Sequence, residues 1–289
     1  RLRSRGLGDV YKRQDWYSKL SKDILLDLAQ PTHMGFPSLL MNSGEIKNTG
    51  IEFTISADPF TGKGFSWHTD VTLSHNKGTF NSIPTANHRQ QQAGSFQNQL
   101  FQMIEGEKLG TFWGYTFGGI WQEDEVNAPF VDANGQTNGK TNGEVYKVVA
   151  GNSKYVDTNK DGVLNDADQG IIGCGQPTFN WGWNNSFNYK NFDFSFFMVG
   201  FHGFDIYNAT HQMGFNTVSG QNMAAVTPMR DFLNRWTPTN TNTDVPGFVQ
   251  GGTENKVFSS RFVENGSFIK MKSITLGYTL PELACKSLG

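Results

Sequence analysis

The chain has 289 residues, a formal net charge of −2 and a pI of about 6.3, so it lacks the basic field that nucleic-acid binding requires. Only 17% of the residues are charged, whereas glycine (33) and phenylalanine (24) are abundant, as in a β protein with many turns and aromatic faces. No run of 18 apolar residues occurs, which excludes a transmembrane helix. A transmembrane barrel stays open, because its strands alternate lipid-facing and channel-facing residues.

The first 14 residues, RLRSRGLGDVYKRQ, are basic but lack the apolar segment of a secretory signal peptide. They resemble translated library-adapter sequence, a contaminant at the ends of assembled reads. We therefore predict that residues 1–14 are a non-native leader and that residues 15–289 are the protein itself.

Residues 51–57 and 65–75 predict a first β-hairpin. Each arm alternates apolar and polar side chains with a period of two, and the turn at residues 62–64 separates them. Each arm approaches the roughly 9–11 residues that a tilted membrane strand needs. The apolar parity consists of Ile51, Phe53, Ile55, Ala57, Phe65, Trp67, Val71 and Leu73.

Residues 179–189 and 192–196 predict a second hairpin, which turns at Lys190-Asn191. Its aromatic parity is interpreted as lipid-facing or as part of an interfacial girdle, whereas in a β-sandwich the same stripe would form the buried core. The residues of this parity are Trp181, Trp183, Phe187, Tyr189, Phe192, Phe194 and Phe196.

Residues 267–280 predict one more strand, with a change of phase. Ile269 and Met271 stand on one parity, but Ile274, Leu276 and Tyr278 stand on the other, which predicts a β-bulge near Lys272-Ser273. Residues 223–236 are the only helical candidate, and Pro228 weakens it.

Long polar stretches connect these hairpins, at residues 76–102, 124–152 and 204–257. Loops of this length count against a compact soluble domain. They are expected on an outer-membrane barrel, where one rim carries long extracellular loops and the other carries short turns. Loop aromatics could stack on sugar rings, although such residues more often pack against their own loop; they are Phe96, Phe101, Phe130, Phe215 and Phe248.

Residues 157–168 (DTNKDGVLNDAD) fit the spacing of an EF-hand-type calcium loop. The predicted ligands at positions 1, 3, 5, 7, 9 and 12 are Asp157, Asn159, Asp161, the carbonyl of Val163, Asn165 and Asp168. Gly162 takes the sharp turn at position 6. No helical pattern flanks the loop, so a bound Ca²⁺ is predicted to be structural, and a solvated Asx-rich turn is the alternative.

Motifs of the common enzyme classes are absent: no G-x-S-x-G, H-E-x-x-H, P-loop or G-x-G-x-x-G segment occurs. A glycosidase needs two carboxylates, and the candidates by residue type are Glu105, Glu107, Glu123, Asp124 and Glu125. Among 26 acidic residues such pairs arise by chance, so solvated loop charge explains them. The two cysteines, Cys174 and Cys285, form no metal or redox spacing; free thiols are expected, and a bridge stays open. We predict that the protein is not an enzyme.

A series of sequence blocks runs along the chain. They include residues 15–26 (DWYSKLSKDILL), 42–53 (NSGEIKNTGIEF), 105–122 (EGEKLGTFWGYTFGGIWQ), 157–177, 188–193, 236–240, 259–272 and 276–278. In this order they resemble the SusC/RagA family of TonB-linked outer-membrane proteins. The second block is similar to that family's N-x-G-x-x-x-N-x-G-hydrophobic-E segment, departing near its second residue.

The resemblance implies an all-β fold, namely a partial and open antiparallel transmembrane β-barrel with long extracellular loops. It further implies a C-terminal portion of a TonB-dependent receptor, with the plug domain, the early strands and the final strands lying outside this chain. An open sheet edge in lipid leaves backbone groups unpaired, so the chain by itself is not expected to form a closed pore.

The same resemblance implies a place in the cell outer membrane and the import of large nutrients, either glycan oligomers or peptides. The implied partners are a SusD-like lipoprotein, TonB–ExbB–ExbD acting through the plug, and outer-membrane lipid. The alternative is a secreted carbohydrate-binding or adhesin β-sandwich with a structural calcium. The long loops and the two-sided aromatic exposure favour the barrel.

Overall fold

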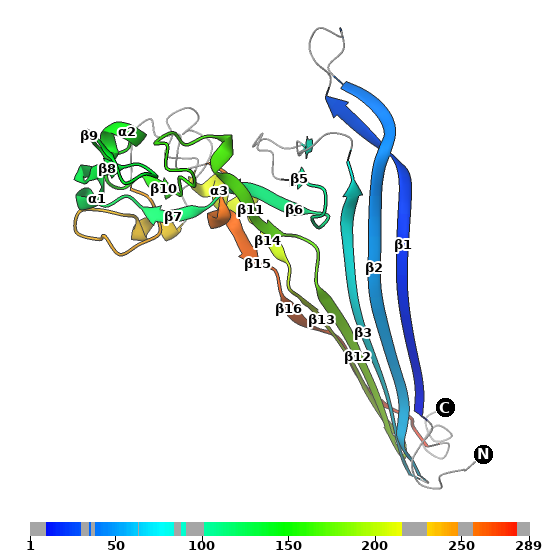
Figure 1. The fold of residues 1–289 in the computed structure, drawn as a ribbon. Helices are drawn as coiled ribbons and strands as arrows, with labels where there is room; N and C mark the ends of the chain where they lie inside the picture. Colours follow the sequence, from blue (N-terminus) through cyan, green and yellow to red (C-terminus); the bar gives the residue numbers. More distant parts are fainter. Residues whose placement is uncertain are drawn as a thin grey trace.

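The structure is a computed structural model that describes residues 10–29, 35, 38–62, 64–83, 88–90, 101–215, 230–247 and 257–281. One six-stranded antiparallel sheet, in the order β1-β2-β3-β12-β13-β16, runs along the molecule (Figure 1). Its strands are β1 (Val10–Ala29), β2 (Ser38–Thr61), β3 (Phe65–Ser82), β12 (Phe179–Tyr189), β13 (Phe192–His202) and β16 (Phe268–Tyr278). The sheet does not close on itself, because β1 and β16 stand at its two edges.

The described residues between 101 and 174 and between 203 and 265 form a separate mass of short elements beyond one end of the sheet, here called the loop unit (Figure 1). A four-stranded sheet, β11-β6-β5-β4, joins it to residues 88–90, and three two-stranded sheets complete it. Its strands are β5 (Phe101–Met103), β6 (Thr111–Tyr115), β7 (Phe117–Ile120), β8 (Pro129–Val131), β9 (Thr137–Thr141), β10 (Ser153–Tyr155), β11 (Gln169–Cys174), β14 (Asp205–Tyr207) and β15 (Val263–Asn265), with β4 spanning His88–Gln90. The helical pieces are α1 (Glu123–Asn127), α2 (Asn142–Tyr146), α3 (Ala209–Phe215) and the 3₁₀ turns Asp166–Asp168, Arg230–Asn234 and Ser260–Phe262.

Short turns and long loops segregate to opposite ends of the sheet, as predicted (Figure 1). Gly62 and Phe65 close the β2–β3 turn by a 2.9 Å backbone hydrogen bond, and Lys190 turns the β12–β13 hairpin with φ at 54°. The two turns lie side by side, because the amide of Lys190 donates to the carbonyl of Gly64 at 3.0 Å. The asymmetry of the rims is that of an outer-membrane barrel.

The buried apolar residues lie mainly in and under the loop unit rather than along the lower sheet. One cluster pairs Phe112 with Phe258, and another pairs Val245 with the fully buried Phe262. A third cluster, around Phe80, lies where the long strands meet the loops. Among the described residues, the sheet therefore gains little of its stability from an internal core, and its apolar face is left as a contiguous exposed surface of the kind that marks an interaction site.

The predicted bulge in β16 is confirmed. Ser273 pairs with Phe197 and Met271 pairs with Met198, so Lys272 is the extra residue between two regular stretches. The bulge reverses the parity of the sequence at this point and leaves Ile269, Met271, Ile274, Leu276 and Tyr278 on one face.

Deletion of Lys272 is therefore expected to leave a regular β16 with every side chain on its present face. We predict a change in the unfolding free energy of at most about 1 kcal/mol, since the register with β13 is retained. Deletion of Thr275 instead turns Ile274 toward the polar face and Ser273 toward the apolar one, at a further cost of about 1.5–3 kcal/mol. Urea titration of the full-length protein in lipid vesicles measures both, and equal losses would contradict the assigned bulge.

The N-terminal part of β1 departs from the alternation of the other strands. Lys12 and Gln14 stand opposite the apolar Ile55 and Phe53, on the face that carries apolar side chains elsewhere. Residues 1–9 lie outside the described residues, and the non-native origin of residues 1–14 stays a prediction.

Several other expectations meet the structure in part. The segment 76–82, predicted as loop, continues β3 instead, because its alternation is hidden by polar residues. Of the helical candidate at 223–236, residues 230–234 form a 3₁₀ turn and residues 223–229 lie outside the described residues. Cys174 is a free thiol, and Cys285 also lies outside the described residues.

Candidate functional site

The two faces of the main sheet differ sharply in chemistry. Register places the side chains of Trp67, Phe187 and Phe194 on one face, in neighbouring strands. Trp67 and Phe187 stack with ring centres 5.8 Å apart, and Trp183 meets Phe196 edge to face at 5.4 Å. Cross-strand aromatic pairs of this kind stabilise a sheet from one side.

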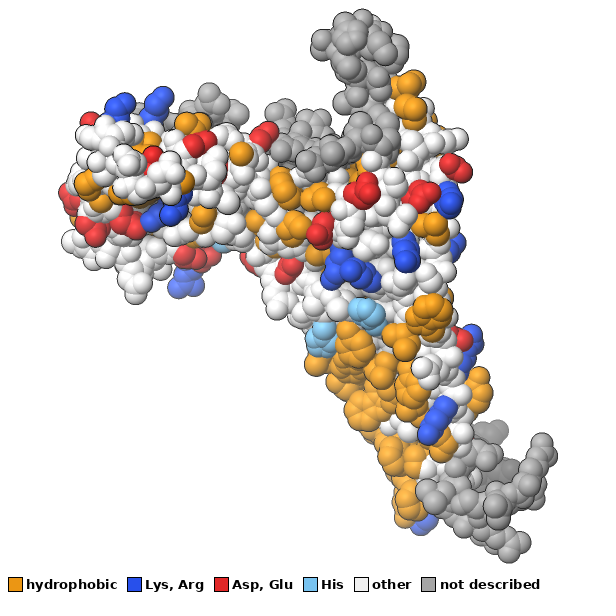
Figure 2. All heavy atoms as spheres, in the orientation of Figure 1, with side chains coloured by type: hydrophobic (Ala, Val, Ile, Leu, Met, Phe, Trp, Pro, Cys, Tyr) orange, Lys and Arg blue, Asp and Glu red, His pale blue; other side chains and the backbone are white. Residues whose placement is uncertain are grey.

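This apolar face is open to the surroundings. Leu276 is 72% exposed and Ile274 is 63% exposed, although both are large aliphatic side chains. Figure 2 shows the apolar side chains gathered in a band over the lower part of the sheet. A β-sandwich would seal these residues under a second sheet, so their exposure favours hydrocarbon as the natural covering.

The opposite face is largely polar and hydrogen-bonded along the strands. His68 lies between two carboxylates, with Nδ1 2.8 Å from Asp58 and Nε2 3.0 Å from Asp70. Asn184 donates to Asp70 at 3.4 Å, and Asn188 donates to Ser66 at 3.2 Å. A polar wall of this kind suits water or a polar cargo beside it. No helix in the described part of the chain is long and apolar enough to cross a membrane.

The Asp157 loop is held together by side-chain-to-backbone hydrogen bonds that follow its predicted positions. Asp157 Oδ2 accepts from the amide of Gly162 at 2.9 Å, and Asp161 Oδ1 accepts from the amide of Val163 at 2.7 Å. Asp168, only 3% exposed, accepts from the amides of Thr158 and Asn165, both at 2.9 Å. The twelfth residue is thereby folded back beside the first.

Gly162 is required at the sixth position of this loop. Its φ of 81° lies in the left-handed region, and an added Cβ would stand 2.6 Å from Val145 Cγ1. The loop therefore packs closely against α2. This agrees with the turn that the sequence assigned to Gly162.

The side chain of Asp157 shows whether the loop has an oxygen atom available to bind a cation. Its Oδ1 is buried and accepts no hydrogen bond from any residue that the structure describes, which leaves a carboxylate oxygen available as a ligand. Tyr146 donates to Oδ2 of the same carboxylate at 2.8 Å. Burial, together with this hydrogen bond to Asp157, raises the pKa of Tyr146, so the phenol stays protonated and remains a donor.

Within the described residues, no three His, Cys, Asp or Glu side chains are grouped as they would be around a metal ion, and this covers Asp157, Asp161 and Asp168. The predicted set also draws on Asn159, Asn165 and a carbonyl. The six-ligand calcium site stays a prediction.

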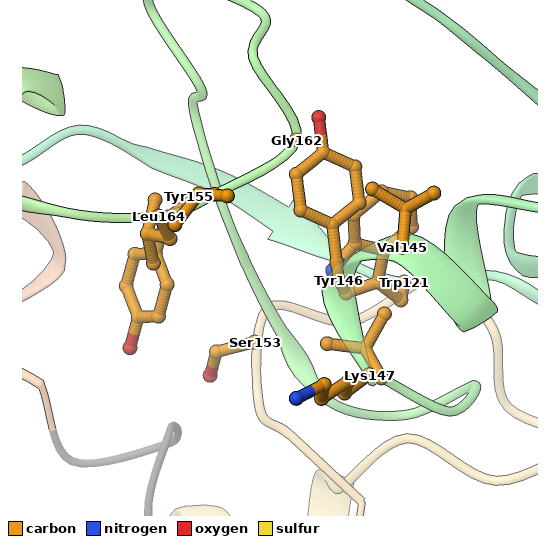
Figure 3. A pocket seen from close by; sticks show the side chains of 10 residues that line it. Trp121, Val145, Tyr146, Lys147, Ser153, Tyr155, Gly162 and Leu164 are labelled. Atoms are coloured by element: carbon orange, nitrogen blue, oxygen red, sulfur yellow. The ribbon is translucent and has the colours of Figure 1, made fainter. Parts of the chain in front are cut away.

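A pocket of about 340 Å³ adjoins the loop (Figure 3). Figure 3 shows Tyr155 and Leu164 opposite Tyr146, Trp121 and Val145. Gly162, Val163 and Leu164 of the loop line this pocket, and Tyr146 of α2, which also lines it, donates to Asp157 of the loop. The shape of the pocket therefore depends on the conformation of the loop.

Of the five loop aromatics singled out from the sequence, the two whose side chains the structure describes pack inside the loop unit. Phe101 packs on Phe112 at 5.1 Å, and Phe130 is 5% exposed. The side chains of Phe96, Phe215 and Phe248 lie outside the described residues. Sequence reasoning did not single out Trp236, which is half-buried beside an open groove. The block at residues 236–240 gave it no role in binding, because the residues that pack around it, such as Gln122 and Gly151, come from distant segments.

No family model matches the chain, but individual proteins of similar sequence and structure were found. The chain is 32% identical over 272 residues to TonB-dependent receptor P3 of Formosa agariphila, covering 93% of this chain and 25% of that protein. It is 30% identical over 278 residues to TonB-dependent receptor P26 of the same organism, covering 95% of this chain and 26% of that protein. TonB-dependent receptor SusC of Bacteroides thetaiotaomicron is 24% identical over 273 residues, with 93% and 24% covered.

Solved structures show the same fold. The structure of the RagAB peptide transporter matches with a TM-score of 0.68 at 19% identity, covering 94% of this chain and 27% of that chain. The RagAB peptide importer in the open-open state matches with a TM-score of 0.69 at 18% identity. The proteins named in these matches are receptors and transporters rather than enzymes.

The chain spans about a quarter of the length of the curated relatives it matches. Its open antiparallel sheet, its one-sided apolar face and its long loops at one rim agree with those matches. The chain therefore belongs with the TonB-dependent receptors of the SusC/RagA type, as part of an all-β transmembrane barrel.

Proposed function

We propose that the protein to which this chain belongs imports a large nutrient across the outer membrane, and that it is not an enzyme. TonB-dependent receptors are outer-membrane proteins, and the relatives carry that name. The observation that carries the proposal is the main sheet, whose apolar face is exposed and whose other face is polar. In this arrangement the first face meets lipid and the second lines the channel.

The transported nutrient is a glycan oligomer or a peptide. One of the matched structures is that of the RagAB peptide transporter, which supports the peptide class for that protein. The proposed partners are a SusD-like lipoprotein at the rim that carries the loop unit, and TonB–ExbB–ExbD acting through a plug domain. Import then consists of binding and gated passage, with no covalent bond made or broken.

Deletion of the full-length gene is expected to abolish growth on the nutrient that the receptor carries. Growth is measured on single polysaccharides and on peptides as sole carbon source, with glucose as the control. Reintroduction of the gene restores growth, whereas a gene that lacks the residues of this chain does not, because the barrel cannot close. Unchanged growth of the deletion strain on every tested polymer contradicts the import function.

We also propose that the Asp157 loop binds a structural Ca²⁺ through Asp157, Asn159, Asp161, the Val163 carbonyl, Asn165 and Asp168. The support is the spacing of the oxygen ligands and the buried Oδ1 of Asp157, which accepts no hydrogen bond from the residues that the structure describes. When bound, the ion supplies a fixed centre of positive charge. It thereby holds the 157–168 segment, and through Tyr146 the wall of the adjoining pocket, in one conformation.

A further inference from the structure

We propose that an open groove in the loop unit, between α1 and residues 236–242, binds a neutral oligosaccharide over the face of Trp236. The inference rests on the proposed import function and names the substrate class. The groove has a volume of about 820 Å³ and is lined by Trp236, Gln122, Glu123, Asp124, Asn127 and the 238–242 turn. Its size falls within the range of small-molecule sites, about 300–1,000 Å³.

Hydrogen bonds from its side chain and its backbone hold Trp236 in one position. Its Nε1 donates to Gln122 Oε1 at 2.9 Å, and its backbone amide donates to the carbonyl of Val245 at 2.8 Å. Gln122 is itself anchored, because its Nε2 donates to the carbonyls of Ile120 at 3.0 Å and Thr241 at 3.4 Å. A rigid aromatic ring offers contact area at low cost in conformational entropy.

The six-membered ring of the indole is packed against backbone. A Cβ at Gly151, where φ is 91°, would stand 2.7 Å from the ring at Cε3, and one at Gly247 would stand 3.2 Å from it. Trp236 is half-buried and lines the groove, so part of this residue faces the groove. A flat aromatic surface that is backed by backbone suits stacking of the C–H face of a pyranose ring.

The rim of the groove carries polar groups that are free to bind. The side chains of Glu123, Asp124, Asn127 and Asn242 are exposed, and none hydrogen-bonds to any residue in the described part of the chain. Carboxylates accept hydrogen bonds, and amides both donate and accept them. This mixture matches the hydroxyl groups of a sugar, each of which is both a donor and an acceptor.

The charge and backbone of the groove favour a neutral glycan over the alternatives. Two free carboxylates repel uronates and sulfated sugars. A peptide that binds by strand addition needs an open backbone edge, but the backbone amides of Thr237 and Asn240 already donate to each other's carbonyls, at 3.2 and 2.9 Å. Side-chain oxygens and amides therefore dominate recognition.

The test uses the full-length receptor in detergent and measures binding by calorimetry. The probes are neutral glucan, mannan, galactan and xylan hexasaccharides, oligogalacturonate, and a trilysine peptide. At least one neutral oligosaccharide is expected to bind, with affinity reduced at least tenfold in Trp236→Ala and at least threefold in Glu123→Gln/Asp124→Asn. The double variant changes only exposed side chains, so it stays informative if Trp236→Ala fails to fold.

Glu105→Gln/Glu107→Gln removes the same two charges elsewhere in the loop unit and is expected to leave binding unchanged. Binding of oligogalacturonate or trilysine in place of the neutral sugars overturns the proposal. It is likewise overturned by no binding of any neutral sugar, or by equal affinity in the groove variants. Growth of the gene-deletion strain reports on import separately, so a failure of the groove and a failure of the import function are distinguishable.

Discussion

The substitution Phe194→Lys is expected to destabilise the barrel by about 2–4 kcal/mol, because it places a charge on a face that meets hydrocarbon. Phe194 lies in β13 between Phe187 and Leu276 on the apolar face. Its ring centre is 6.0 Å from those of both Phe187 and Phe196, so the substitution also removes two aromatic contacts. Unfolding of the full-length receptor by urea in lipid vesicles measures the loss.

Ser195→Lys provides the matched control, since it introduces the same charge one residue further along the same strand. Ser195 stands between Ser186 and Thr275 on the polar face. A lysine there reaches the water-filled side, so the expected loss is at most about 1 kcal/mol. Equal losses at the two positions, or the reverse order, would mean that the lipid-facing and channel-facing assignments are wrong.

The faces of the main sheet were predictable from the sequence because period-two alternation is a local property. The register of strand pairing then places residues of the same kind opposite each other in neighbouring strands. Phe187 pairs with Phe194, and Trp183 pairs with Met198. The bulge at Lys272 was predictable for the same reason, as a change of phase within a single strand. In a long alternating segment, the sequence itself determines which side chains share a face, whatever the strand packs against.

The length of the early strands was less predictable. β2 begins at Ser38 and β3 continues to Ser82, well beyond the alternating cores at 51–57 and 65–75. In these extensions polar residues stand on both parities, for example Asn76 and Lys77 opposite Gly50 and Thr49. Pairing between neighbouring strands holds them as strand, and a single sequence does not reveal such pairing.

The internal structure of the loops could not be predicted from spacing alone. Gln122 and Trp236 are more than a hundred residues apart, yet their side chains bond to each other and shape the groove. The small helix α2 begins with a capping interaction, in which Thr141 accepts from the amide of Glu144, a signature too short to outweigh the polar composition around it. By contrast, the turn of the Asp157 loop at Gly162 was predictable, because its signal lies within twelve consecutive residues. The calcium site of the loop stays a prediction.

Replacement of Asp168 by alanine is expected to destabilise the loop unit by about 2–5 kcal/mol, with or without calcium. The buried carboxylate accepts from the amides of Thr158 and Asn165, and its removal leaves both donors without a partner. Thermal unfolding, followed by tryptophan fluorescence of the full-length receptor, measures this loss. Trp121 lies in the adjoining pocket and reports on it.

Asp161→Asn separates calcium binding from this structural role. Asp161 is exposed, and an asparagine keeps an oxygen that can accept from the amide of Val163. Without calcium the variant is expected to stay within about 0.5 kcal/mol of the wild type, as is usual for surface substitutions. In wild type, millimolar CaCl₂ is expected to raise the unfolding temperature, because an ion that binds only the folded state stabilises it. Asp161→Asn is expected to weaken that response, because it removes one of the negative charges that attract the cation.

Asp166→Asn provides the matched control, since Asp166 is an exposed acid of the same segment at a position that supplies no predicted ligand. It should keep the full response to calcium. Terbium luminescence offers a direct reading of occupancy, because Tyr146 bonds to Asp157 and lies close enough to sensitise a bound lanthanide. A wild-type response to calcium in Asp161→Asn, or no terbium signal in the unaltered receptor, would leave the segment as an Asx-rich turn held only by hydrogen bonds from backbone amides to Asp157, Asp161 and Asp168.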